Sequence, residues 1–179
     1  GSMPHAELCQ KIGMVFQSYD LFPHMTVMEN ITLAPLQVQH RNKEEVLKEA
    51  RKMLSRIGLS DKENAYPREL SGGQKQRAAV ARALITNPQL VLADEPTGAL
   101  DSRSADDLLK LFADINREGQ TILMVTHSVK AASHASRILF ISDGAVFHQM
   151  YRGNATSEEM FQKISDTLTT MTTGGGIHD

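Results

Sequence analysis

The sequence predicts an α/β fold in which helices cover both faces of a mostly parallel sheet. After residue 87, short apolar runs alternate with helical patterns, and these runs are apolar at nearly every position. Strands that are apolar on both faces are typical of parallel sheets lying between layers of helices. A helical stretch at residues 26–86 separates the first strand from the later ones. We therefore expect this stretch to form a lobe inserted into the α/β core.

The first half of the chain is predicted to contain one strand followed by helices. Residues 11–16 mix β-forming side chains and run into a polar loop. Residues 26–36 carry apolar side chains at helical spacing, and Pro35 is expected to end this helix at or near the preceding residue. The clearest amphipathic helix lies at residues 43–58, where Gly58 supplies a stop signal.

The second half alternates strands with helices. Ser71 and Gln74 fit a capping box that opens a helix through Ile85, which breaks before Pro88. The later elements are predicted as strands at 90–93, 121–125, 138–141 and 145–150, and as helices at 104–116, 130–134 and 157–168, before a frayed tail at 169–179. The Asp143-Gly144 pair predicts a tight turn between the last two strands, and Thr156 with Glu159 a cap for the terminal helix.

These patterns divide the chain into four parts. We assign residues 1–10 to a leader with a tag remnant, 11–17 and 87–150 to the α/β core, 18–86 to the helical lobe, and 151–179 to a C-terminal helix and tail. The tag interpretation rests on Gly1-Ser2-Met3, which looks like the product of tag cleavage.

Composition narrows the class of protein. The chain has 179 residues, of which 41% are apolar and 22% charged, as in an ordinary soluble domain. A formal net charge of -2 gives no long-range attraction to nucleic acid, so we expect no nucleic-acid partner. Cys9 is the single cysteine of the sequence, which excludes an intrachain disulfide, and no apolar run is long enough to cross a bilayer. We therefore expect a cytoplasmic protein.

The start of the helix at residue 71 is a candidate phosphate site. A helix N-terminus carries unpaired N–H groups and partial positive charge. Gly72 and Gly73 place no Cβ between that backbone and an approaching anion. The alternative interpretation is an ordinary capped helix start, because Gly-Gly pairs are frequent in loops.

The end of the strand at 90–93 is a candidate metal site. Asp94 and Glu95 follow this buried strand, at the edge of the sheet where ligands bind in open α/β folds. One carboxylate can hold Mg²⁺ through water while the other polarises an attacking water. The alternative is a solvated strand end. His127 closes the next strand and is expected at the same edge, although a lone histidine there is more often structural.

Five segments, in this order and spacing, resemble the motifs of ABC transporter ATPases. They are the Q-loop at Gln17, the LSGGQ signature at 70–74, the Walker B segment at 90–95, the D-loop at 98–101 and the switch histidine at His127. The resemblance covers roughly residues 11–150. It implies a P-loop NTPase-like (RecA-like) core, truncated at the N-terminus, with an inserted α-helical lobe.

The resemblance also implies roles for individual residues. Asp94 would assist Mg²⁺ together with Gln17, Glu95 would act as general base, and His127 would contact the γ-phosphate. Gln17 would also link the metal site to a membrane subunit.

In the family, the signature acts across a dimer. The resemblance therefore implies that Ser71, Gly72, Gly73 and Gln74 clamp nucleotide bound to the opposite protomer. Asp101 would communicate between the two protomers.

The phosphate-binding loop of the family is missing from this sequence. No G-x-x-x-x-G-K-[ST] motif occurs, and the glycines at 174–176 lack the following lysine and helix. The chain thus looks as if it begins after this loop and its strand. We expect that the isolated chain neither binds ATP tightly nor hydrolyses it. Because the family places that strand inside the sheet, we also expect unpaired edges and an oligomer.

Two hypotheses remain. The first is the ATP-hydrolysing subunit of an ABC transporter, which would use ATP and Mg²⁺ in the intact parent. It would pair with a second ATPase subunit under a transmembrane permease, on the cytoplasmic face of the membrane. The second is a non-catalytic interaction module of the same family. Residues 93–101 and the end of the chain from His127 onwards resemble exporters that detach lipoproteins or confer resistance to peptide antibiotics. Residues 15–27 look more like importers of polar amino acids.

Overall fold

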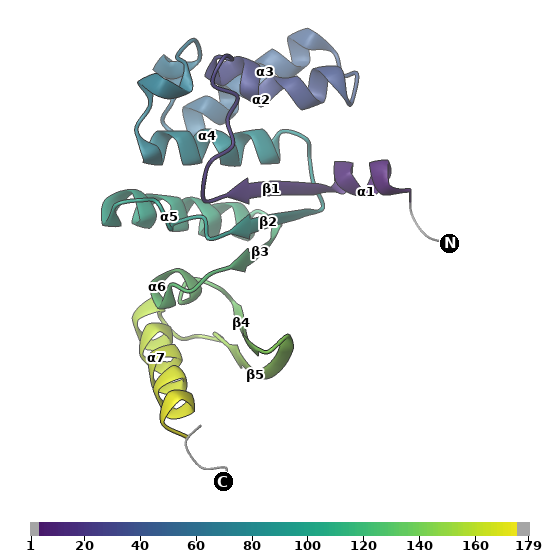
Figure 1. The fold of residues 1–179 in the computed structure, drawn as a ribbon. Coiled ribbons are helices and arrows are strands. Elements are labelled where there is room, and N and C mark those ends of the chain that lie inside the picture. Colours follow the sequence, from purple (N-terminus) through teal and green to yellow (C-terminus); the bar gives the residue numbers. More distant parts are fainter. Residues whose placement is uncertain (1–3, 175–179) are drawn as a thin grey trace. The chain divides into compact units, whose positions relative to one another are not determined.

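The computed structural model describes residues 4–174 and divides into two compact units, Gly1–Val125 and Thr126–Asp179 (Figure 1). The predicted tag remnant at residues 1–3 and the end of the tail at 175–179 lie outside the described residues. Within residues 4–174, every helix is too short or too polar to cross a bilayer.

The first unit contains the predicted parallel sheet. Its strands, in order across the sheet, are β1 (Ile12–Phe16), β2 (Leu90–Asp94) and β3 (Thr121–Val125). The register places Phe16 beside Asp94 and Asp94 beside Val125. The three strands therefore end level with one another, and the loops that follow them share one edge of the sheet.

Most helices of this unit occupy the predicted positions. They are α1 (His5–Lys11), α2 (Val27–Gln37), α3 (Lys43–Arg56), α4 (Gly72–Leu84) and α5 (Ser102–Arg117), with 3₁₀ turns η1 (Ser60–Lys62) and η2 (Pro67–Glu69). Gly58, with φ of +73°, follows α3 as the predicted stop. Helix α1 was not predicted, because residues 4–11 show no helical periodicity and bury no side chain.

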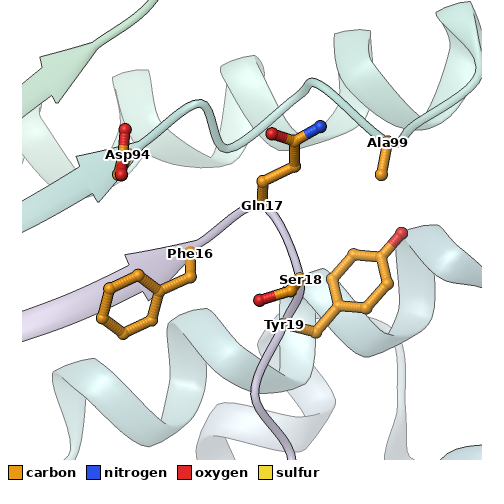
Figure 2. A pocket seen from close by; sticks show the side chains of 6 residues that line it. All are labelled: Phe16, Gln17, Ser18, Tyr19, Asp94 and Ala99. Carbon is orange, nitrogen blue, oxygen red and sulfur yellow. The ribbon is translucent and has the colours of Figure 1, made fainter.

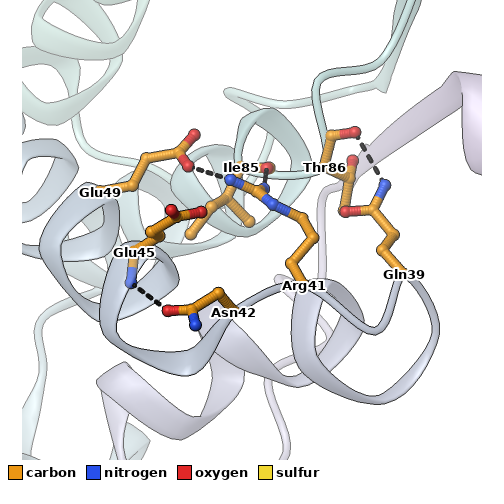
Figure 3. A network of polar contacts seen from close by, with 7 residues as sticks. All are labelled: Gln39, Arg41, Asn42, Glu45, Glu49, Ile85 and Thr86. Carbon is orange, nitrogen blue, oxygen red and sulfur yellow. Dashed lines mark hydrogen bonds and ion pairs between the residues drawn. The ribbon is translucent and has the colours of Figure 1, made fainter.

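Polar contacts tie the loop between α2 and α3 to the end of α4 (Figure 3). Gln39 Nε2 donates to the Thr86 carbonyl at 3.0 Å, and Arg41 Nη1 donates to the Ile85 carbonyl at 2.9 Å. Arg41 also pairs with Glu49 of α3. Since these bonds satisfy carbonyls at the C-terminus of α4, they fix three helices relative to one another.

Within the first unit, helices cover one face of the sheet, so the prediction of helices on both faces is not confirmed there. Val15, Val91 and Ala93 are buried in one core together with side chains of α4 and α5. On the opposite face, Leu123 is 51% and Val125 60% exposed. The alternating burial along β3 matches a half-covered strand, whereas its continuous apolar sequence predicted burial on both sides.

Pro35 lies inside α2, so the predicted helix end was wrong as well. Proline removes one backbone N–H, but it sits in the last turn, where one missing bond is tolerated. The N–H groups of Val38 and Gln39 both donate to the Ala34 carbonyl and close the helix beyond the proline.

The second unit is a hairpin packed on a helix. Its elements are α6 (Val129–Ala132), β4 (Arg137–Ser142), β5 (Ala145–Tyr151) and α7 (Ser157–Gly174). The predicted turn is confirmed, because Asp143 and Gly144 both have positive φ, as a tight hairpin turn requires. Ile138 and Phe140 of β4 are buried against Met160 and Ile164 of α7.

Two expectations for this unit were wrong. We expected the strand at 138–141 to belong to the parallel sheet, but β4 pairs antiparallel with β5 in a separate two-stranded sheet. We expected the tail to fray from residue 169, but α7 continues to Gly174. In this last part of α7, the hydroxyls of Thr169 and Thr170 donate to carbonyls one turn earlier. The predicted cap by Thr156 and Glu159 is confirmed.

Candidate functional site

The aligned strand ends of the first unit form an open cavity of about 460 Å³. It is lined by Phe16, Gln17, Ser18, Tyr19, Asp94 and Ala99. Figure 2 shows the Gln17 side chain pointing from the end of β1 toward the segment that joins Asp94 to Ala99. The structure therefore brings together the two residues predicted to assist a metal ion.

Asp94 and Gln17 are suitable ligands for Mg²⁺ but are not a complete site. Carboxylate and amide oxygens are hard ligands of the kind this ion prefers, and Mg²⁺ commonly takes only one or two carboxylates plus phosphate oxygens of a substrate. Among residues 4–174, no group of three or more His, Cys, Asp or Glu side chains is placed to hold a metal ion. The remaining ligands would have to come from nucleotide and water.

Glu95 follows Asp94 in a sharp turn. Its φ is +45°, in the left-handed region that costs an L-residue energy. Its N–H donates to the Val125 carbonyl at 2.8 Å, and its carbonyl accepts from the Gly98 N–H at 3.0 Å. Backbone strain of this kind is frequent at functional sites. Here it turns the chain back at the edge of the sheet, directly after the candidate metal ligand.

The signature segment forms the predicted capping box. Ser71 Oγ accepts from the Gln74 N–H at 3.2 Å, and Gln74 Oε1 accepts from the Ser71 N–H at 2.9 Å. The two side chains thus satisfy two of the unpaired backbone donors at the start of α4, the N–H groups of Ser71 and Gln74.

The two signature glycines pack against side chains from other segments. A Cβ at Gly72 would lie 2.8 Å from Tyr19 Oη, and a Cβ at Gly73 would lie 2.7 Å from Ser104 Oγ. These distances are too short for real Cβ contacts. Tyr19 and Ser104 thus lie beside the Cα atoms of these glycines. Glycine is therefore needed here for protein packing. The predicted contact of the signature with a phosphate stays a prediction.

Arg82 is a contributor that sequence reasoning missed. Its guanidinium donates to the carbonyls of Tyr19 and Asp20, which follow Gln17 and have φ of +66° and +51°. Burial lowers the pKa of Arg82, and the neighbouring Asp20 carboxylate partly offsets that change. The arginine holds an otherwise unfavourable turn against α4, and no local pattern predicts a pair 62 residues apart.

Asp101 is the N-cap of α5. Its carboxylate accepts the Ser104 N–H at 2.8 Å and the Ser104 hydroxyl at 3.1 Å. These bonds, the backbone one first, hold the pKa of Asp101 below its ordinary value. Ser104 therefore contacts both the predicted dimer residue and the signature glycine.

The capping role of Asp101 predicts a pH dependence of stability. Because the folded pKa of Asp101 is depressed, its stabilising contribution is fully present above the unfolded value of about 3.9 and is lost as the pH falls from there through the lower folded pKa. Asp101→Asn keeps a neutral cap. The free energy of unfolding of this variant is therefore expected to fall less steeply as the pH is lowered through the acid range. Urea denaturation from about pH 7 to pH 3 measures this. Asp61→Asn, at an exposed position in η1, is the control; equal pH profiles for the two variants would contradict the prediction.

His127 belongs to the second unit. It is exposed and lies between Thr126 and Ser128, where the Ser128 N–H donates to Thr126 Oγ1 at 3.0 Å. Its predicted contact with a γ-phosphate stays a prediction.

Comparison with known proteins decides the family. The sequence profile of the ABC transporter family matches residues 3–98. This chain belongs to the ABC transporter family. The L-cystine import ATP-binding protein TcyC of Bacillus subtilis is 50% identical over 144 residues, which are 80% of this chain and 58% of TcyC. The glutamine transport ATP-binding protein GlnQ of Escherichia coli is 48% identical over 138 residues, 76% of this chain and 58% of GlnQ.

A solved structure agrees with the fold. The dimeric ATP-binding cassette MJ0796, in a post-hydrolysis state bound to ADP and Pi, has a TM-score of 0.71 and 38% identity; the match covers 84% of this chain and 68% of that chain. The predicted fold class, that of an ABC ATPase, is thereby confirmed. This ABC chain spans less than two thirds of the length of its curated relatives.

Proposed function

We propose that this chain is part of the ATP-binding subunit of an ABC transporter and supplies the metal-assisting, general-base and signature residues of its nucleotide site. The observation that carries the proposal is the shared register of β1 and β2, which brings Gln17 and Asp94 to one cavity directly before Glu95. In this proposal Asp94 and Gln17 would hold Mg²⁺, and Glu95 would accept a proton from the water that attacks the γ-phosphorus of ATP. The bond from that phosphorus to the ADP oxygen would break, so that phosphate and ADP leave.

The partner assignments belong to the same proposal. The signature at 71–74 would act on nucleotide held by a second ATPase subunit, either a copy of the same protein or a related one, with Asp101 and His127 near the shared site. The dimeric MJ0796 cassette supports this arrangement. A transmembrane permease would hold the pair at the cytoplasmic face. We further assign the helical lobe to residues 18–86 and the α/β core to 11–17 and 87–150.

The named relatives support a polar amino acid as cargo. TcyC is named for cystine import and GlnQ for glutamine transport, at 50% and 48% identity. The non-catalytic alternative would keep the fold and the dimer surface without hydrolysis.

A chimera tests the proposal. The matched segment of Escherichia coli GlnQ is replaced by the corresponding residues of this chain, and phosphate release from Mg·ATP is measured. We expect magnesium-dependent hydrolysis at a rate within about tenfold of GlnQ, because about half the residues are shared. A tenfold change in rate corresponds to about 1.4 kcal/mol in the activation free energy. The isolated 179-residue chain is expected to release no phosphate. A folded chimera that binds ATP without hydrolysing it would favour the non-catalytic alternative.

A further inference from the structure

One buried amide links the two loops of the candidate site. Gln76 lies in α4, two residues after the signature, and is 0% exposed. Its Nε2 donates to the Phe16 carbonyl at 2.9 Å and to the Pro96 carbonyl at 2.7 Å. Phe16 directly precedes Gln17, and Pro96 directly follows Glu95.

The orientation of this amide is determined by its neighbours. Both contacts are carbonyl oxygens, which only accept, so the NH₂ group must face them. Gln76 Oε1 is then left buried and without a hydrogen-bond partner among the described residues. An unsatisfied buried acceptor destabilises a fold, so the two bonds that the NH₂ group donates must offset that loss. Glutamine at this position therefore serves the contacts with the Phe16 and Pro96 carbonyls.

The two loops that Gln76 joins also touch each other. A Cβ at Gly98 would lie only 2.7 Å from Gln17 Nε2, so the Gln17 side chain rests against the segment after Glu95. The Glu95 turn itself is in a strained conformation, with φ of +45°, and such conformations persist only where surrounding contacts hold them. Gln76 supplies a contact of that kind from α4.

We propose that Gln76 is a positioning residue that sets the spacing between the Gln17 and Glu95 loops and couples that spacing to the signature helix. It touches neither metal nor nucleotide and acts through the backbone on either side of the site. Because a single nitrogen donates to both carbonyls, a movement of α4 displaces both loops together. The significance of that spacing for ATP hydrolysis rests on the proposed function, but the spacing itself does not.

The sequence carries a faint signal of this role. Gln76 shares one face of α4 with Ala79, Val80 and Ala83, all of which are buried. A polar residue on an apolar helix face is either paired or functional. The signal shows that the glutamine needs a partner but does not identify the loops that provide it.

The test replaces Gln76 with methionine in the 179-residue chain, which removes both donors at similar side-chain length. The nuclear Overhauser contact between the Gln17 side-chain amide and Gly98 is expected to disappear, and the Phe16 and Pro96 carbonyl carbon signals to move. Amides at residues 17–20 and 97–98 are expected to exchange about tenfold faster or more, because both hydrogen bonds from Gln76 to these loops are lost.

Gln39→Met is a matched control. Gln39 also donates from Nε2 to one backbone carbonyl, that of Thr86, and also keeps a buried Oε1 without a partner among the described residues. This variant is expected to move the Thr86 carbonyl signal while keeping the contact between Gln17 and Gly98. Because Gln76→Met removes two donated bonds and Gln39→Met removes one, the Gln76 variant is expected to melt at a slightly lower temperature.

Either of two results would overturn the proposal. One is an unchanged contact between Gln17 and Gly98 in Gln76→Met. The other is a general loss of amide protection throughout the first unit, with melting far below Gln39→Met, since that would make Gln76 a residue of overall stability. No nucleotide enters the experiment, so an inactive GlnQ chimera would count against the proposed function alone.

Discussion

In the GlnQ chimera, Glu95→Gln is expected to lower the rate of ATP hydrolysis by about 100-fold or more, the usual contribution of a general base. Glutamine keeps the size of the side chain but cannot take the proton of an attacking water. Nucleotide binding is expected to change little, because Asp94 and Gln17 remain. Single-turnover measurement of phosphate release, alongside equilibrium ATP binding, separates these two effects.

The control for Glu95 is another glutamate of the same chain. Glu44 lies exposed in the first turn of α3, and Glu44→Gln is expected to hydrolyse ATP at the rate of the parent chimera. If Glu95→Gln retains that rate too, Glu95 is not the base. If Glu95→Gln loses ATP binding instead, its carboxylate contributes to the nucleotide site rather than to the chemical step.

The placement of Gln17, Asp94 and Glu95 was predictable from local patterns. Each follows or ends a short apolar run, and parallel strands of equal length end at the same edge of a sheet. The capping box at Ser71 was predictable for the same reason, since both partners lie within one helical turn. These features need only short-range sequence information.

The contacts that hold these segments together were not predictable in this way. Gln76 and Phe16 are 60 residues apart, and Arg82 reaches a carbonyl 62 residues away. Which carbonyl a buried donor meets depends on how α4 packs on β1, and no periodicity encodes that. The contacts of Tyr19 with Gly72 and of Ser104 with Gly73 were not predicted for the same reason.

Helices on both faces of the sheet were predicted because the strands are continuously apolar. An apolar strand can be buried, but its sequence does not show which element packs against it within the first unit. Leu123 and Val125 would suit a buried strand, yet both are more than half exposed. The same ambiguity applies to Ile141 of β4, which is 65% exposed. An exposed apolar face of this kind is a surface prone to association, so the expectation of an oligomer stays a prediction that light scattering can test.

Asn30 carries the largest expected effect on stability. Its side chain is 1% exposed and anchors the loop that runs from the Gln17 segment into α2. Oδ1 accepts the Phe22 N–H at 2.8 Å, while Nδ2 donates to the carbonyls of Phe22, Met25 and Thr26 at 3.2, 3.2 and 3.0 Å. One side-chain amide thereby supplies hydrogen-bond partners to the backbone of a loop that contains no strand or helix.

Asn30→Ala is expected to lower the free energy of unfolding by about 3 kcal/mol, because it removes the four hydrogen bonds that the Asn30 amide makes with the backbone of this loop. Asn42→Ala is the control, since Asn42 caps α3 through one exposed bond of 3.1 Å to the Glu45 N–H, and loss of such a cap costs about 1 kcal/mol. Urea denaturation of the 179-residue chain compares the two. Equal losses would mean that the loop at 22–26 is held by its apolar contacts and that the Asn30 amide contributes no more than an ordinary cap.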